Sequence, residues 1–144
     1  MRVSGILASK GTTVATIAPQ ASIAEAADEL RRHGIGALVV SSDGRSVDGI
    51  ISERDIVLRL SEAGGDVLGQ PVSAVMTSEV QTCALDDTCD ELMRVMTEQR
   101  TRHLPVVTQG ELAGIVSIGD VVKRRVTELE DETRHLHDYI VTGR

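Results

Sequence analysis

The sequence predicts an α+β protein made of two tandem β-α-β-β-α repeats packed sheet to sheet around a pseudo-twofold axis, with a long amphipathic helix at the C-terminus. Three observations lead to this prediction. The second half of the 144-residue chain repeats the residue pattern of the first half. Each half has the same order of helix-start signals, apolar runs and polar turns, and an apolar heptad pattern continues to the C-terminus.

The repeat is visible when the two halves are aligned with an offset of 66 residues. The identical pairs are Val14/Val80, Thr16/Thr82, Glu25/Glu91, Leu38/Leu104, Val40/Val106 and Gly44/Gly110. After a shift of one residue in a turn, the pairs Gly49/Gly114, Ile50/Ile115, Ser52/Ser117 and Asp55/Asp120 follow. Repetition at a fixed period indicates one supersecondary unit used twice.

Helix and strand signals occur in the same order in both repeats. Short strands at Thr16-Ile17 and Thr82-Cys83 come first. Capping boxes then start a helix at Ser22-x-x-Glu25 and at Thr88-x-x-Glu91. Two apolar runs joined by a polar turn follow, and a second helix ends each repeat. The predicted strand pairs are 37–40 with 49–51, and 104–107 with 112–116.

One repeat of roughly 50–60 residues has too small a core for a secure independent fold. We therefore expect the two sheets to bury one shared apolar layer. We assign repeat 1 to residues 1–63, a linker to 64–74, repeat 2 to 75–127 and a C-terminal helical extension to 128–144.

The composition disfavours a polyanionic or membrane partner. Fifteen Lys and Arg against 22 Asp and Glu give a net charge of −7, whereas nucleic-acid binding depends on neutralising phosphates. The sequence shows no signal peptide and no apolar run long enough to span a membrane. We interpret Cys83 and Cys89 as small buried hydrophobic residues, and we expect a cytoplasmic protein.

A seven-residue motif, Gly-x-x-Ser-x-x-Asp, occurs at 49–55 and again at 114–120. Residues 34–40, 75–77 and 102–107 provide further family-like segments, and together these features resemble CBS domains over roughly residues 3–127. The chain is most similar to short stand-alone proteins made of one CBS pair. The resemblance implies a non-catalytic energy or redox sensor, a disc-like homodimer, and no required cofactor. It also implies that AMP, ATP, NAD(H) or S-adenosylmethionine binds between the repeats.

The motif residues have a chemical role in such a site. Ser52 and Ser117 stand where a strand turns into a helix, so a hydroxyl and helix N-terminal amides could bind phosphate there. Asp55 and Asp120 offer two acceptor oxygens for the ribose diol. The same pattern is also an ordinary helix cap, and the sequence leaves both interpretations open.

Other candidate site residues differ between the repeats. Repeat 1 has Gly36-Ala37 where repeat 2 has Arg102-His103, and the resemblance implies that this basic pair reaches the phosphates of one of the two sites. Arg54 and Lys123 are further phosphate candidates or solvated charges. Backbone groups near Thr16-Ile17 and Thr82-Cys83 would recognise the base, unless these segments are plain core strands.

Metal binding and hydrolysis are disfavoured. Cys83, Cys89 and His103 lack the spacing of a metal site and a fourth ligand. Neither motif serine has a nearby histidine in the sequence, and no nucleophile-elbow motif is present.

The C-terminal segment has an apolar seam with the alternating four- and three-residue spacing of a coiled coil. Its members are Val122, Val126, Leu129, Thr133, Leu136 and Ile140. The seam either packs back on the body of the protein or contacts a second copy or a regulated partner protein. The second possibility allows an alternative function, an interaction module with vestigial nucleotide sites.

Overall fold

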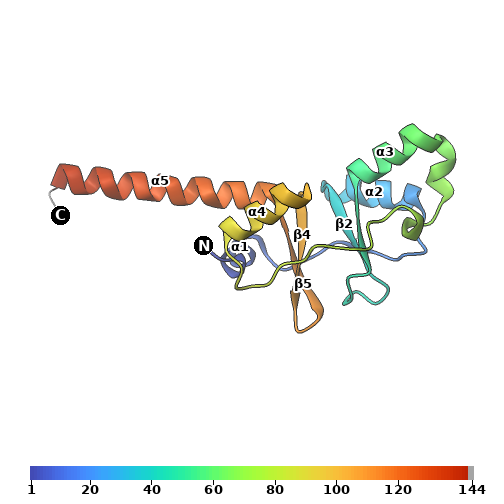
Figure 1. Ribbon diagram of the computed structural model, residues 1–144, viewed down its shortest axis with the longest axis horizontal. Helices are drawn as coiled ribbons and strands as arrows, with labels where there is room; N and C mark the ends of the chain where they lie inside the picture. The colour runs from blue at the N-terminus through green and yellow to red at the C-terminus, as the bar shows by residue number, and fades with distance from the viewer. Residues whose placement is uncertain (143–144) are drawn as a thin grey trace.

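The computed structural model describes residues 1–142 and confirms the α+β fold and the long C-terminal helix. The elements are α1 (Val3–Lys10), β1 (Thr16–Ile17), α2 (Ile23–His33), β2 (Ala37–Val40), β3 (Gly49–Ser52), α3 (Glu53–Ala63), the 3₁₀ turns η1 (Gly65–Gly69) and η2 (Val72–Ala74), α4 (Cys89–Gln99), β4 (His103–Thr108), β5 (Glu111–Ser117) and α5 (Ile118–Thr142). Figure 1 shows the strands of both repeats at the centre of the body, with α2 and α3 on one side and α1 and α4 on the other.

Repeat 1 contains a three-stranded sheet in the order β1-β2-β3. β1 runs parallel to β2, and β2 runs antiparallel to β3. The capping box predicted at Ser22 and Glu25 starts α2, and Gly34 ends this helix in the left-handed conformation at φ 63°. Local sequence signals were therefore sufficient to predict where α2 starts and ends.

Repeat 2 follows the same plan with a smaller sheet of β4 and β5. The strand predicted at Thr82-Cys83 is reduced to an isolated parallel bridge between Cys83 and Val106. α4 starts at the predicted Thr88 capping box and ends at Arg100, which has a φ of 52°. Arg100 is the counterpart of Gly34, so this helix end pays the steric cost that glycine avoids.

The buried side chains form two clusters, one in each repeat. Leu38 and Val40 of β2 belong to the repeat 1 cluster, and Leu104 and Val106 of β4 belong to the repeat 2 cluster. Because side chains alternate along a strand, Val39 points to the other face of β2, and it too is fully buried. Each repeat therefore has its own core, and the sheets cover one another with their second faces.

The segment that precedes each repeat packs on the other repeat. Val3, Ile6 and Leu7 of α1 lie in the repeat 2 core, and the Val3 amide donates to the Asp87 carbonyl at 2.9 Å. Conversely, Thr77 at the start of repeat 2 exchanges two 2.9 Å backbone hydrogen bonds with Ile50 of β3. The sequence boundaries of the repeats are thus not the boundaries of the packed units.

The connecting segment 64–74 is also part of a core. Val67 in η1 and Val72 at the start of η2 are fully buried in the repeat 1 cluster. The Ile23 amide at the start of α2 donates to the Gln70 carbonyl at 2.9 Å. This segment links the repeats in sequence and closes one side of repeat 1 in space.

The first glycine of each motif contacts the segment that precedes the other repeat in the sequence. A Cβ on Gly49 would lie 2.5 Å from Sδ of Met76 and 2.9 Å from the Thr77 carbonyl oxygen. A Cβ on Gly114 would lie 2.8 Å from Cδ1 of Leu7. The motif glycines therefore accommodate the leading segment of the other repeat.

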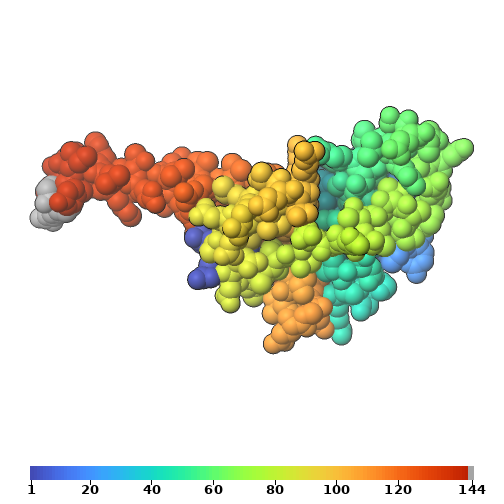
Figure 2. Space-filling view, viewed as in Figure 1, coloured from blue at the N-terminus to red at the C-terminus, as the bar shows by residue number. Residues whose placement is uncertain are grey.

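α5 continues well beyond the body as one helix of 25 residues. Figures 1 and 2 show it as an arm, with the C-terminal end far from both sheets. Packing of the apolar seam back on the body is therefore ruled out: Val126, Leu129, Leu136 and Ile140 are exposed. Charged residues interrupt the arm, and no helix within residues 1–142 is long and apolar enough to cross a membrane.

We expect Gly49→Ala to destabilise the protein by about 1–3 kcal/mol, because the added methyl group meets a backbone carbonyl that cannot rotate away. Gly114→Ala should cost less, because the Leu7 side chain can shift. Gly65→Ala is the control, since its Cβ would meet no atom within 4 Å. Chemical denaturation measures all three variants, and equal stability of Gly49→Ala and Gly65→Ala would contradict this packing.

Candidate functional site

Both Ser-x-x-Asp motifs form complete capping boxes. At the start of α3, Oγ of Ser52 accepts from the Asp55 amide at 3.2 Å, and Oδ2 of Asp55 accepts from the Ser52 amide at 2.9 Å. At the start of α5, the equivalent distances for Ser117 and Asp120 are 3.1 and 2.9 Å. The interpretation of the motifs as helix caps is therefore confirmed.

Helix capping leaves part of each carboxylate available. Oδ2 is the acceptor in the capping bonds of both Asp55 and Asp120, so Oδ1 of each carboxylate can face a ligand. Both side chains are only partly buried. A cap and a ribose contact are therefore compatible on the same residue.

The sheet register determines which candidate residues accompany each motif. Ala37 lies opposite Ser52, and His103 lies opposite Ser117. The backbone repeats this symmetry: the Glu53 amide donates to the Gly36 carbonyl at 2.9 Å, and the Ile118 amide donates to the Arg102 carbonyl at 2.8 Å. Gly36-Ala37 therefore borders the first motif, and Arg102-His103 borders the second.

The His103 side chain lies between the two motifs. A Cβ on Gly36 would be 3.4 Å from Cε1 of His103 and 3.5 Å from Oε1 of Glu53, so the ring reaches across to repeat 1. Burial lowers the pKa of His103, and the positive charge of Lys10 adds to this effect. Glu53 and Asp120 act in the opposite direction. His103 is therefore a neutral hydrogen-bonding group at the junction of both sites.

Lys10 is a site residue that the sequence did not reveal. Its Nζ donates to Oδ2 of Asp120 at 2.6 Å and to the Ile115 carbonyl at 2.9 Å. Burial alone would raise the pKa of Asp120, but the bonds from Lys10 and the Ser117 amide outweigh it, and the pKa is lowered. Lys10 stands more than a hundred residues from Asp120 in sequence, so no local pattern joins the two.

The two sites have opposite electrostatic surroundings. Lys10 and His103 accompany Asp120, whereas the carboxylate of Glu53 stands beside the Gly36 edge of the Asp55 site. An open groove of about 510 Å³ between α2 and α3 reaches this edge at Gly36 and Glu53. The Asp55 site thus has the less positive surroundings.

Three basic residues that the sequence suggests for phosphate binding have exposed side chains. Arg54 lies in the first turn of α3, Arg102 precedes β4, and Lys123 lies in the second turn of α5. Within residues 1–142 none of the three forms an ion pair. The structure places Arg102 next to the second motif and leaves Arg54 and Lys123 as solvated charges near their own helix starts.

The strand residues predicted to recognise the base are mostly committed to the fold. The Ile17 side chain lies in the repeat 1 core and the Cys83 side chain in the repeat 2 core. The Cys83 amide and carbonyl bond to Pro105 and Val107, and the Ile17 carbonyl accepts from Ser41. Base recognition by backbone groups near Ile17 and Cys83 stays a prediction, with most of these groups already bonded within the fold. Thr16 pairs with Val39, two residues beyond Ala37, and Thr82 is exposed beside Cys83.

The register indicates which backbone segments approach the motifs more closely. Extending the parallel pairing of Thr16 with Val39 places Val14 opposite Ala37, and the equivalent extension places Val80 opposite His103. The irregular segments before β1 and before Cys83 are thus the nearer candidates for contact with a base.

The chain was next compared with known proteins. A family model described as CBS domain matches residues 9–62 and 72–127. The chain belongs to the CBS domain family. CBS domain-containing protein YhcV of Bacillus subtilis is 36% identical over 117 residues, which cover 81% of each chain.

Solved CBS proteins have the same fold. The CBS-domain containing protein ATU1752 from Agrobacterium tumefaciens is 47% identical, with a TM-score of 0.85 over 87% of this chain and 99% of that chain. CBS domain protein PAE2072 from Pyrobaculum aerophilum, complexed with AMP, is 27% identical, with a TM-score of 0.78 over 92% and 99%.

A second liganded relative carries different ligands. The CBS domain pair of protein MJ0100, in complex with 5-methylthioadenosine and S-adenosyl-L-methionine, is 26% identical, with a TM-score of 0.79 over 89% of this chain and 98% of that chain. The relatives thus bind adenosine compounds both with and without a phosphate group.

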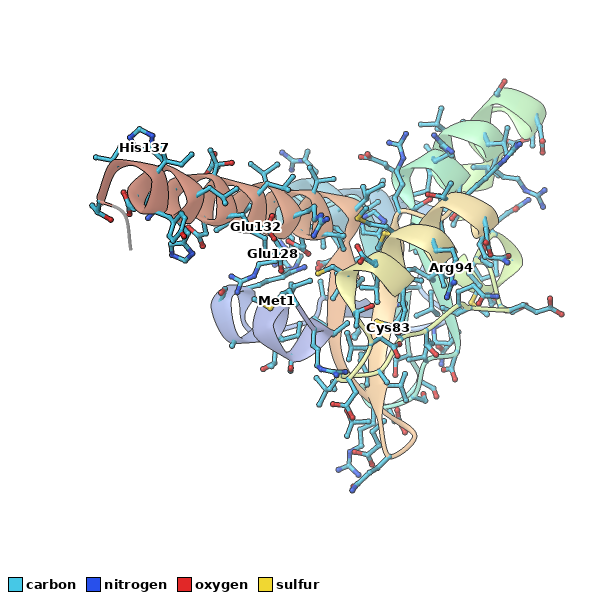
Figure 3. The ribbon with its side chains drawn as sticks, turned by 60° about the vertical axis from the view of Figure 1, so that its left-hand side comes forward. Met1, Cys83, Arg94, Glu128, Glu132 and His137 are labelled. Carbon is cyan, nitrogen blue, oxygen red and sulfur yellow. The ribbon has the colours of Figure 1, made fainter. Side chains whose placement is uncertain are left out.

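The two thiols of this CBS pair have structural roles. Cys83 and Cys89 are buried and free, and burial raises the pKa of Cys83 to about 12 and also raises that of Cys89. Figure 3 shows Cys83 among the side chains of repeat 2. No group of His, Cys, Asp and Glu within residues 1–142 is arranged to hold a metal ion.

We expect acid to destabilise the CBS pair through His103. Its folded pKa lies below the unfolded value of 6.5, so the unfolded chain takes up a proton first and the free energy of unfolding falls as the pH drops through about 6.5. Thermal melts from pH 7.5 to 5.5 should show a shallower decline for His103→Gln than for the wild type. The exposed His135→Gln is the control, and a parallel decline in all three proteins would refute the assignment.

Proposed function

We propose that this CBS pair is a non-catalytic regulatory module that binds an adenine nucleotide between its two repeats. The observation that carries the proposal is the pair of capped Ser-x-x-Asp motifs, which flank His103 and each leave a carboxylate oxygen open. The adenosine compounds in the MJ0100 and PAE2072 structures support the same ligand class. The buried free thiols suit a reducing compartment, and we propose the cytoplasm.

The Asp120 site is proposed to bind a compound that carries phosphate. The ribose diol would donate to Asp120, while the Ser117 hydroxyl would donate to a phosphate oxygen at the start of α5. Lys10 bonds to Oδ2 of Asp120, so the ribose could take Oδ1 while Lys10 stays within reach of a phosphate. Arg102 and the neutral His103 add further donors on the same side. AMP, ATP and NAD(H) all fit this description.

The Asp55 site is proposed to bind adenosine compounds without phosphate, or to bind nucleotides weakly. Glu53 places a negative charge at its edge, and Arg54 is exposed on the rim. 5-Methylthioadenosine has no phosphate, and the sulfonium of S-adenosylmethionine is positively charged. One strong and one weak nucleotide site would follow from this difference in charge.

Signalling requires that a ligand binds one arrangement of the repeats better than another. The Asp120 site provides such a coupling, because Lys10 belongs to α1 and α1 packs against both repeat 2 and α5. Ligand binding at Asp120 would therefore change the contacts of α1 with the start of α5, at the base of the C-terminal arm. We propose that an energy or redox signal reaches a partner protein, or a second copy of the chain, through this arm.

The exposed arm also favours a second candidate function. An interaction module with vestigial nucleotide sites would act through α5 without any ligand, because its apolar seam is already uncovered. Retention of both complete motifs and of the Lys10–Asp120 contact supports the nucleotide-binding function instead.

A dye-based thermal melt against AMP, ADP, ATP, NAD, NADH, S-adenosylmethionine and 5-methylthioadenosine tests the proposal. A ligand at 100 times its Kd stabilises the folded state by about 2.7 kcal/mol, which raises the Tm by roughly 5–10 °C. Asp120→Asn should weaken phosphate-bearing ligands about 10- to 100-fold, because hydrogen bonds to a charged group are lost. Asp55→Asn should weaken those without phosphate.

Glu25→Gln is the matched control for these variants, because Glu25 holds the same capping-box position in α2, at the start of another helix. It should leave every ligand shift unchanged. Flat melts across the panel at millimolar concentrations would reject nucleotide binding and favour the interaction module.

Lys10→Met separates phosphate binding from ribose binding. It retains the aliphatic stem and removes the charge, so we expect weaker binding of AMP or ATP and little change for 5-methylthioadenosine. Isothermal titration calorimetry measures both ligands. Equal weakening of both would show that Lys10 only maintains the shape of the site.

A further inference from the structure

The arm formed by α5 exposes a continuous apolar strip. The seam residues Val122, Val126, Leu129, Leu136 and Ile140 are between 47% and 78% exposed. They extend over 19 residues, or about 28 Å of helix. A strip of this length on a helix is stable in water when another surface covers it.

The body of the protein leaves this strip free. Val121, Arg124 and Glu128 form the face of α5 that meets the body, with Val121 fully buried and the Met1 amino group 3.5 Å from Oε1 of Glu128. Figure 3 shows Met1 beside Glu128, and Glu132 and His137 farther along the arm. At 100° per residue the centre of the seam lies about 130° around the helix from this face. A partner can therefore approach the seam without touching the body of its own chain.

The residue types along the seam favour two parallel helices. In heptad positions, Val126, Thr133 and Ile140 occupy a, and Val122, Leu129 and Leu136 occupy d. β-Branched residues at a with leucine at d favour two-stranded parallel coiled coils. The Thr133 hydroxyl already donates to the Leu129 carbonyl at 2.9 Å, so it can enter an interface without losing a bond.

The surface of the arm is hollowed along the middle of the seam. A shallow groove is lined by Val126, Leu129, Glu130, Thr133, Arg134 and His137. These residues surround the central a and d positions, where a side chain of a facing helix inserts in knobs-into-holes packing.

The flanking charges decide between the two helix orientations. In a parallel pair, a residue at g faces the residue at e five positions later in the other helix. Arg125 then faces Glu130 of the second copy, and Glu132 faces His137 of the second copy. An antiparallel pair centred on the seam would bring Glu130 near Glu130 and Glu132 near Glu132, which are repulsive contacts.

We infer that α5 pairs in parallel with α5 of a second copy of this chain, as a short two-stranded coiled coil along the Val122–Ile140 seam. The inference stands apart from nucleotide binding, since it uses only residues of the arm. The pairing places the two bodies at the same end of the coiled coil.

Sedimentation equilibrium of the full chain tests the interface. Leu129→Glu should convert the dimer to a monomer at low micromolar concentration, because it places a charge at a central d position. Val141→Glu is the matched control, since Val141 is also an exposed apolar residue of the arm but lies off the seam, and its variant should remain dimeric. The body of the Leu129→Glu variant should melt at a temperature similar to that of the wild type, which shows that the variant is folded. A dimer that survives Leu129→Glu would overturn the inference.

Disulfide trapping tests the orientation. A parallel pair places position 133 of one helix beside position 133 of the other, so Thr133→Cys should give a linked dimer under mild oxidation. Asp131→Cys on the outer face should not. A link that forms only when Leu129→Cys is combined with Thr133→Cys would identify an antiparallel pair and overturn the parallel one.

Charge exchange provides a second readout of orientation. Glu130→Arg should weaken the dimer about tenfold by facing Arg125, and adding Arg125→Glu should restore it. An antiparallel pair would show no such restoration, because Arg125 and Glu130 do not meet in it.

Discussion

The close contact between each motif glycine and the leading segment of the other repeat holds this molecule together. Met76 and Thr77 press against Gly49, and Leu7 presses against Gly114. These contacts join two small cores that share no buried cluster. Gly49 and Gly114 lie in β3 and β5, the strands that end at Ser52 and Ser117, where the following helices start. The geometry of both candidate sites therefore depends on how the exchanged segments pack.

Lys10 shows how this exchange produces asymmetry from a duplicated unit. α1 carries a lysine to Asp120, whereas the Asp55 carboxylate bonds only within its own capping box among the described residues. The two carboxylates are thus equivalent by sequence and different by environment. The proposed difference in ligand between the two sites rests on the charge of these surroundings rather than on the motif itself.

The sequence predicted the parts of the structure that depend on local interactions. The capping boxes at Ser22 and Thr88 start helices as expected, and the apolar runs form the expected strand pairs. The candidate residues Ser52, Asp55, Ser117, Asp120, Gly36 and His103 lie close to the junction of the repeats. Their ligand contacts remain a proposal.

Long-range contacts account for what the sequence did not predict. α1 has no side-chain cap, and its stability comes from packing on residues 83–121, which lie far along the chain. For the same reason Lys10 could not be joined to Asp120, and residues 64–74 read as a polar linker although Val67 and Val72 are buried.

The packing of α1 on repeat 2 also has a consequence for synthesis of the chain. α1 is made before repeat 2, but the core that covers Val3, Ile6 and Leu7 is completed only after β5 and the start of α5 have been made. Repeat 1 can gather its own cluster earlier, with the N-terminal helix still unpaired. Contacts of such high sequence separation slow folding and leave apolar surface exposed in the meantime. The apolar face of α1 therefore stays uncovered until repeat 2 has been made.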